Sequence, residues 1–149
     1  MFSRQKAASE MWTNKLKGAL VTSRQPKAMD AVLKGCQQIM QEHGSGQTEA
    51  FYHRMLEIYL YDRGIPCLKE VDCFTMAGAV PVLVGRIDLE VDHTIILELK
   101  IGSKIQGKHL QQVRKYAHAR KATGMNVQVA AVICFTDHET VEIQQLLKA

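Results

Sequence analysis

No run of apolar residues in the 149-residue chain approaches the ~20 residues that a helix needs to span a bilayer, so we expect no membrane-spanning segment. The start lacks the apolar core of a signal peptide, and we therefore expect a soluble, intracellular protein of the cytoplasm or the nucleus. The first 24 residues are basic and poor in acids. Because transit peptides share this composition, organelle targeting is an alternative.

The four cysteines include no C-x-x-C pair. They are scattered along the chain, as Cys36, Cys67, Cys73 and Cys134. This spacing indicates neither a zinc site nor a disulfide framework, and we expect reduced thiols that are mostly buried.

Acidic residues are absent between Glu98 and Asp137, although the formal net charge of the whole chain is only +4. The segment between them begins with Lys100 and then carries Lys104, Lys108, Arg114, Lys115, Arg120 and Lys121. A segment of one sign is typical of proteins that bind a polyphosphate, so we expect the six residues after Lys100 to contact nucleic acid. A solvated helix face is the alternative interpretation.

The length favours one domain, which we place at residues 25–149, after a basic extension over residues 1–24. A helix from Ala7 to Leu20 is expected in the extension, where it would contact nucleic acid or pack on the domain. A frayed terminus is the third interpretation of this segment.

Hydrophobic periodicity, together with glycine and proline boundaries, divides the domain into helices and strands. Helices are predicted from about Pro26 to Gly44, over Thr48–Arg63, and from Ser103 or Gly107 to about Ala122. Strands are predicted at 67–76, 84–91, 94–100 and 127–135. A capping-box pattern at 136–139 predicts a last helix that reaches Leu147. This order predicts an α/β fold with a central mixed β-sheet flanked by helices.

The segment from Val84 to Lys100 organises the rest of the chain, because it predicts two strands joined by a turn at Asp92-His93. Charged and mostly apolar residues alternate in the first strand, which predicts Asp88 on a charged face and the apolar residues together on the other. Glu98 and Lys100 are two apart and point the same way from the second strand. A hairpin closed at this turn brings the carboxylates of Asp88 and Glu98 together. Since they repel each other, we expect Mg²⁺ or Mn²⁺ between them.

A D-x9-E-x-K spacing also arises by chance, and Glu and Lys are common on the solvated face of an amphipathic strand. The apolar neighbours of Glu98 favour a site instead. Two more candidates are Gln112 and Tyr116, which stand one helical turn apart and could orient Lys100 or a bound strand. The alternative is a tyrosine that anchors the core and a solvated glutamine. Glu49 lies in the first turn of a predicted helix, where the helix dipole alone could explain an acid.

Four segments stand in register on the predicted elements: Gly46-Gln47-Thr48-Glu49-Ala50-Phe51-Tyr52, Arg63-Gly64-Ile65, Gly85-Arg86-Ile87-Asp88-Leu89 and Leu97-Glu98-Leu99-Lys100. With the Q-x-x-x-Y pair at Gln112 and Tyr116, they resemble the PD-(D/E)xK nuclease superfamily in its RecB-type branch. The closest resemblance is to the GxxExxY protein family, and it covers about residues 30–136. Ile87 stands where the superfamily name has a proline, a position that varies without affecting metal ligation.

The resemblance implies a restriction-endonuclease-like nuclease core in which Asp88, Glu98 and the backbone carbonyl of Leu99 hold the metal. It also implies that Lys100 handles the attacking water and that Glu49 completes the site through a second metal or a water. Gln112 and Tyr116 would line the site on the substrate side.

We therefore expect a Mg²⁺- or Mn²⁺-dependent nuclease that hydrolyses DNA phosphodiester bonds by in-line attack of metal-activated water, with RNA as an alternative substrate. One alternative is a structure-specific, junction-type endonuclease that acts as a homodimer in DNA repair or recombination. Another is a nucleic-acid-binding or protein-binding module with little turnover. Clustered carboxylates that repel each other argue against the binding module, because it gains nothing from keeping them.

Overall fold

The computed structural model describes residues 25–146, so the helix expected within residues 1–24 lies outside them. The helices are α2 (Lys27–His43), α3 (Glu49–Asp62) and α4 (Gly107–Ala122). The strands are β1 (Cys67–Ala77), β2 (Val80–Val91), β3 (Ile95–Gly102), β4 (Val129–Thr136) and β5 (Val141–Gln145). No helix within residues 25–146 is both long and apolar enough to cross a membrane.

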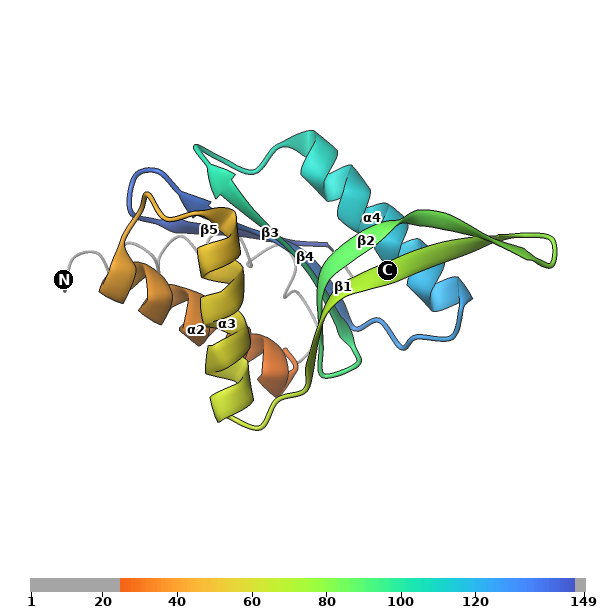
Figure 1. The fold of residues 1–149 in the computed structure, drawn as a ribbon, viewed down its shortest axis with the longest axis horizontal. Coiled ribbons are helices and arrows are strands. Elements are labelled where there is room, and N and C mark those ends of the chain that lie inside the picture. The colour runs from red at the N-terminus through yellow and green to blue at the C-terminus, as the bar shows by residue number, and fades with distance from the viewer. Residues whose placement is uncertain (1–24, 147–149) are drawn as a thin grey trace.

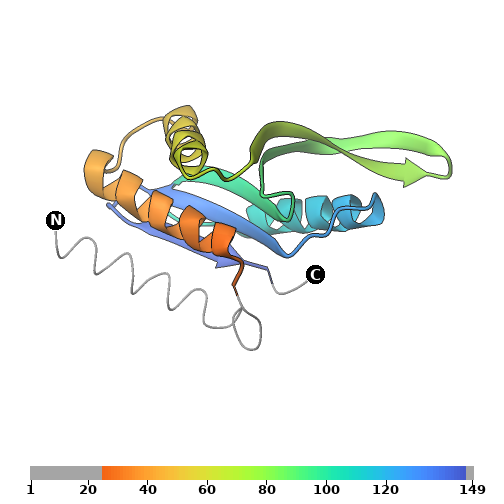
Figure 2. The ribbon, with the colours of Figure 1, turned by 90° about the horizontal axis from the view of Figure 1, so that it is seen from below.

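The five strands form one sheet whose order follows the chain, from β1 to β5. Only β3 and β4 run parallel, and α4 connects them, while the other neighbours are antiparallel. Helices α2 and α3 pack on one face of the sheet and α4 on the other (Figure 1 and Figure 2). The predicted α/β fold, with helices on both sides of a mixed sheet, is therefore confirmed.

Strand β4 shows why this sheet is buried on both faces. Its residues alternate between two apolar clusters: Ala131 and Ile133 pack beneath α2 and α3, whereas Val132 and Cys134 pack beneath α4. Every residue of β4 is buried. An almost wholly apolar strand in the sequence therefore corresponds to the middle of a two-sided sheet.

The helices begin and end close to where the sequence predicts. Pro26 precedes the first turn of α2, and the Oγ1 atom of Thr48 caps α3 by accepting a 3.1 Å hydrogen bond from the backbone N–H of Phe51. Gly64, with a φ of +69°, follows α3 in the left-handed conformation that ends many helices. Six apolar residues that recur at helical spacing along α2 are all buried: Met29, Val32, Leu33, Cys36, Ile39 and Met40.

The predicted last helix is wrong, because the segment after β4 turns back and forms strand β5. Val141 pairs with Phe135 and Ile143 with Ile133, and both side chains are buried. The N–H of Thr136 donates to the carbonyl of Thr140, which closes a turn in place of a helix N-terminus. Glu139 has a φ of +70° and forms hydrogen bonds with Ser45 of the α2–α3 loop. The alternation of apolar and polar residues over 141–145 outweighed the capping-box pattern.

The four cysteines are free, and three of them are buried, as expected. Burial raises the pKa of the Cys67 and Cys134 thiols to about 11. These thiols are therefore protonated and unreactive at neutral pH.

Candidate active site

The β2–β3 hairpin forms as predicted, and its backbone pairing opens where the carboxylates lie. Asp92 and His93 both have positive φ in the tight turn, and regular pairs join Leu89 with Leu97, Glu90 with Ile96 and Val91 with Ile95. The next positions on the two strands are Asp88 and Glu98. No regular pair forms there, so the backbone groups are open to side chains.

Each of these carboxylates accepts a hydrogen bond from the opposite strand. The backbone N–H of Asp88 donates to Oε1 of Glu98 at 3.1 Å, and the backbone N–H of Leu99 donates to Oδ2 of Asp88 at 2.9 Å. This reciprocal arrangement fixes both side chains and holds them against each other. The structure thus brings together the two carboxylates that the sequence pairs.

Strand β2 changes its buried face at Asp88, which the simple alternation did not predict. Ile87 packs in the cluster beneath α4, but Leu89 and Val91 pack in the cluster beneath α2 and α3. Residues two apart on a regular strand share a face, so the strand twists sharply between Ile87 and Leu89. Opposite this point, Glu70 of β1 has a φ of +53°. The expectation that the apolar residues share one face is wrong, because Ile87 and Leu89 are buried on opposite faces of the sheet.

Glu98 is almost completely buried, with 2% of its surface exposed. Burial first, and then the nearby Asp88 carboxylate, raise the pKa of Glu98 to about 8. Lys100 acts in the opposite direction, with its Nζ 3.8 Å from Oε2 of Glu98. The two acids are thus strained against each other in the protein alone, and a cation is the natural way to relieve them.

Glu49 and Asp88 line one cavity, of about 320 Å³, between α3 and the first two strands. Lys100 lines a second cavity, of about 510 Å³, together with Gln112 and Tyr116. Glu98 contacts both Asp88 and Lys100 and therefore connects the two. The predicted residues thus occupy two neighbouring cavities joined by the buried glutamate.

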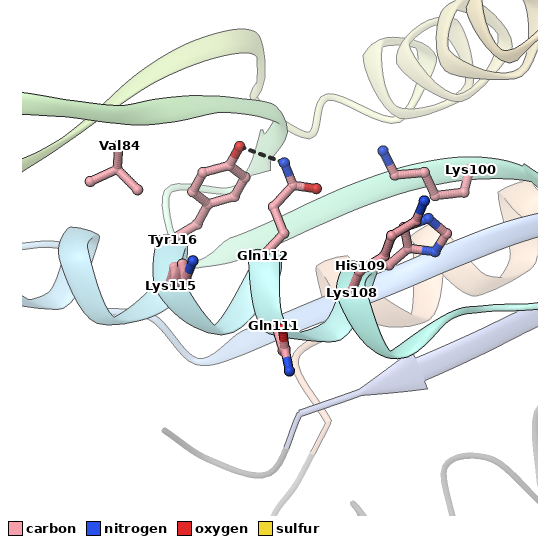
Figure 3. Close-up of a pocket in the computed structure, with 8 residues that line it drawn as sticks. All are labelled: Val84, Lys100, Lys108, His109, Gln111, Gln112, Lys115 and Tyr116. Carbon is pink, nitrogen blue, oxygen red and sulfur yellow. Dashed lines mark hydrogen bonds between the residues drawn. The ribbon is translucent and has the colours of Figure 1, made fainter.

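Gln112 and Tyr116 are joined by a 3.0 Å hydrogen bond from Nε2 to the phenol oxygen (Figure 3). Tyr116 packs against Gly85 so closely that a Cβ atom there would lie 2.6 Å from its hydroxyl oxygen. Burial and the Glu98 charge raise the pKa of Tyr116, so the phenol stays protonated. Tyr116 anchors α4 in the core and also presents its hydroxyl to the Lys100 cavity. The core interpretation and the site interpretation of this residue therefore both hold.

The predicted nucleic-acid-binding residues do not all lie together. Lys108 and Lys115 line the Lys100 cavity (Figure 3). Lys104 and Arg114 are exposed outside it, and Lys121 follows in the last turn of α4. Arg120 makes two hydrogen bonds to the buried Glu90, at 2.6 and 3.0 Å. That charge is already neutralised within the fold, so we expect Arg120 to fix α4 on β2.

The sequence interpretation assigned no role to two residues at or near the site. His109 lines the Lys100 cavity, one turn before Gln112, and this i, i+3 spacing was the signal that could have found it. Tyr52 is buried under the α2–α3 loop, where its hydroxyl donates to the carbonyl of Gly44 at 2.7 Å. Its ring stacks on Phe135 at 4.2 Å. The tyrosine of the G-x-x-E-x-x-Y segment therefore supports the loop that precedes Glu49.

The donor set suits a hard divalent cation that keeps several waters. Within residues 25–146, no three Asp, Glu, His or Cys side chains gather closely enough to form a complete metal cage. Mg²⁺ usually takes only one or two carboxylates, so Asp88 and Glu98 are sufficient in number. Their oxygen chemistry and mutual repulsion fit such an ion, while Glu49 lies apart from the pair.

The five-stranded mixed sheet with helices on both faces has the α/β architecture of a restriction-endonuclease-like core. A sequence model of the PD-(D/E)XK nuclease superfamily matches residues 26–146, and the chain belongs to this superfamily. The crystal structure of SSO0001 is similar, with a TM-score of 0.48 and 16% identity, over 94% of this chain and 76% of that one. No curated protein sequence matches the chain significantly. Membership of the superfamily indicates a nuclease.

The metal-free protein should lose stability as the pH rises from about 5 to 8. The folded state keeps a proton on Glu98 over this window, whereas the unfolded chain has released it, so folding is disfavoured by increasing pH. We expect the melting temperature in EDTA to fall over this pH range. In Glu98→Gln the melting temperature should depend less on pH. Stabilisation by Mg²⁺ should increase as the pH rises, because the cation replaces the proton on Glu98. A stabilisation by Mg²⁺ that is unchanged in Glu98→Gln would contradict this assignment.

Proposed function

We propose that the protein is a Mg²⁺- or Mn²⁺-dependent nuclease that hydrolyses phosphodiester bonds of DNA. The observation that carries this proposal is the reciprocal pairing of Asp88 and Glu98, with Lys100 beside them at the wall of a basic cavity. We also propose that the chain belongs to the Q-x-x-x-Y branch and is related to the GxxExxY proteins. The Gln112–Tyr116 hydrogen bond and the cavity that Glu49 and Asp88 both line support that relation.

Asp88, Glu98 and the backbone carbonyl of Leu99 would hold the cation, with Glu49 reaching it directly or through water. When bound, a divalent cation supplies a Lewis acid that acidifies water and stabilises negative charge on the phosphate. Lys100 orients the attacking water and neutralises charge that develops on the phosphoryl oxygens. Gln112 and Tyr116 hold Lys100 or the bound strand in position, and Lys108 and Lys115 contact neighbouring phosphates.

The decisive experiment incubates the full-length protein with closed circular, linear, single-stranded and branched DNA in EDTA, Mg²⁺ or Mn²⁺. Asp88→Asn, purified in the same way, controls for contaminating nucleases. We expect cleavage only with the cation and only by the parent protein. Cleavage in EDTA, or equal cleavage by Asp88→Asn, would place the activity elsewhere. Cutting of closed circles identifies an endonuclease, and parallel reactions with RNA define the substrate class.

Gln112 and Tyr116 should affect turnover, and Glu49 should also affect metal binding. Gln112 and Tyr116 line the Lys100 cavity, whereas Glu49 shares its cavity with Asp88. We expect Gln112→Ala and Tyr116→Phe to lower the cleavage rate with the Mn²⁺ midpoint nearly unchanged. Glu49→Ala should raise that midpoint by about 10-fold. The measurement is a Mn²⁺ titration of the cleavage rate.

A matched control for Glu49 is Glu57→Ala, because Glu57 lies two turns further along α3 and lines the same cavity. Its loss should leave the Mn²⁺ midpoint close to that of the parent. If Gln112→Ala shifts the midpoint as far as Glu49→Ala does, the division into a metal side and a substrate side is incorrect.

One observation favours the second candidate, a homodimeric, structure-specific endonuclease. The β1–β2 hairpin extends beyond the rest of the fold (Figure 1 and Figure 2) and carries no charged residue between Asp72 and Arg86. Its exposed large apolar side chains are Phe74, Met76, Val80, Val82 and Leu83. Such a surface suits contact with a second copy of the chain. Light scattering, combined with preference for the branched substrate, tests this candidate.

A further inference from the structure

His109 occupies the Lys100 cavity without any role in the function proposed above. It is the third residue of α4, and it lines the cavity with Lys100, Gln112 and Tyr116 (Figure 3). Lys100 is close enough to His109 to influence its ionisation. The imidazole therefore lies where a bound phosphate would meet Lys100.

One ring nitrogen of His109 is already committed to the helix. The backbone N–H of Gln106, the N-cap residue of α4, donates to Nδ1 of His109 at 3.2 Å, and the backbone N–H of His109 donates to the backbone carbonyl of Gln106 at 3.0 Å. A ring nitrogen that accepts a hydrogen bond carries no proton, so the proton of the neutral ring must be on Nε2. This contact at the start of α4 thus selects one tautomer.

The surroundings also keep this ring neutral. Burial first, and then the positive charges of Lys100 and Lys108, lower the pKa of His109. Protonation would place a second N–H against the N–H of Gln106 and break the cap. At neutral pH, His109 therefore offers an Nε2–H donor rather than a second positive charge.

Within the part of the chain that the structure describes, no group accepts a hydrogen bond from this Nε2–H. The nearest charges are the two lysines, which offer no acceptor. An acceptor must therefore come from outside the chain, and a cavity walled by lysines selects an anionic one.

We propose that His109 is a substrate-binding residue, which donates Nε2–H to a non-bridging phosphate oxygen of the nucleic-acid strand beside Lys100. This inference rests on the proposed nuclease function and assigns it a further phosphate contact. The neutral ring already carries the Nε2–H, so His109 acts as a fixed donor and transfers no proton.

The first test measures binding of the full-length protein to a 15-nucleotide single strand in EDTA, where no cleavage is expected. His109→Leu removes the donor, and His109→Gln keeps both an acceptor for the cap and an amide donor. His118→Leu is the matched control, because His118 is exposed further along the same helix and does not line the cavity. We expect His109→Leu to weaken binding about 10-fold. His109→Gln should restore most of it, and His118→Leu should bind like the parent.

The second test observes the ring itself in the parent protein, so it does not depend on the stability of any variant. Long-range ¹H–¹⁵N spectra of histidine-labelled protein should show His109 as the Nε2–H tautomer, assigned by its absence from His109→Gln. The oligonucleotide should shift the Nε2 signal of His109 and leave that of His118 in place. An Nδ1–H tautomer, or an Nε2 signal that the oligonucleotide does not move, would overturn the proposal.

The pH dependence separates a neutral donor from a proton donor. The ratio of parent to His109→Gln cleavage rates should be constant from pH 7 to 9, above the lowered pKa of His109. A ratio that declines with a titration in this range would show that a protonated ring acts, and would overturn the proposal. If the parent cleaves DNA but His109→Leu binds like His118→Leu, this inference alone fails. If the parent neither binds nor cleaves, the nuclease function fails with it.

Discussion

Asp88→Ala, Glu98→Ala and Lys100→Ala should each reduce cleavage by at least about 10²–10³-fold, which is the usual effect of losing one group at a preorganised reaction centre. The two acids are held together by hydrogen bonds from opposite strands, and Lys100 contacts Glu98. The proposed roles are not interchangeable, because both carboxylates would bind the cation together and the lysine cannot bind it. The measurement is the single-turnover cleavage rate at saturating Mn²⁺.

Asp72→Ala provides the matched control for this series. Asp72 is an exposed carboxylate on the neighbouring strand, and its partner is the equally exposed Arg86 at 3.1 Å. A surface pair of this kind contributes little to stability, so the variant should fold and cleave like the parent. If Asp88→Ala keeps the full cleavage rate and Asp88→Asn is also active, the active site does not lie at the hairpin.

Asp88→Asn separates catalysis from folding more cleanly than Asp88→Ala. The asparagine side-chain oxygen can still accept from the N–H of Leu99, while the charge that repels Glu98 is gone. Asp88→Ala instead leaves that N–H without its acceptor. We expect the metal-free Asp88→Asn protein to melt at or above the temperature of the parent, although it is inactive. If metal-free Asp88→Asn melts below the parent, repulsion between Asp88 and Glu98 is not important for stability.

The helices and the central hairpin could be predicted because local chemistry determines them. The apolar spacing in α2, the threonine cap of α3 and the Asp92-His93 turn each act over a few residues. Strand β5 was missed for the complementary reason. The Thr136–Glu139 pattern suits a helix cap locally, but antiparallel pairing with β4 buries Val141 and Ile143, and this long-range gain decides the outcome.

The pairing of Asp88 with Glu98 followed from strand alternation and the turn position, but the surroundings of the pair did not. The sharp twist of β2 at Asp88 depends on packing from two sides, which a single strand pattern does not record. Arg120 shows the same limit. Its charge suggested nucleic-acid binding, yet its partner Glu90 is thirty positions away and becomes a neighbour only when α4 packs on β2.

The basic wall of the Lys100 cavity should determine how binding depends on salt. Lys108 and Lys115 line this cavity, and Arg114 is exposed between them on α4. Each phosphate that a basic residue neutralises lowers log K by about 0.9 per unit of log salt on duplex DNA, and by about 0.7 on a single strand. Replacing all three residues by Ala should therefore flatten the slope by up to about 2.7 on a duplex.

The single substitutions make this prediction sharper. Lys108→Ala and Lys115→Ala should each flatten the slope by about 0.9, and Arg114→Ala by less, because only the lysines line the cavity. Arg120→Ala is not a useful comparison, since it would leave Glu90 buried without its partner. The control removes Lys27 and Lys34, which are exposed on α2 at the other face of the sheet.

The measurement is binding of the Asp88→Asn protein, which we expect to be inactive, to a duplex of fixed length at several salt concentrations in EDTA. The Lys27→Ala/Lys34→Ala control changes the net charge by two, so it reports the effect of overall charge alone. If each lysine removed in this control flattens the salt dependence of binding as much as Lys108→Ala does, binding follows net charge. The cavity is then not the contact surface. If neither set changes the slope, the phosphate contacts lie elsewhere, and the basic residues before Gln25 become the next to replace. A slope that responds only to the α4 lysines would place the bound strand along the wall that leads to Lys100, next to the two carboxylates.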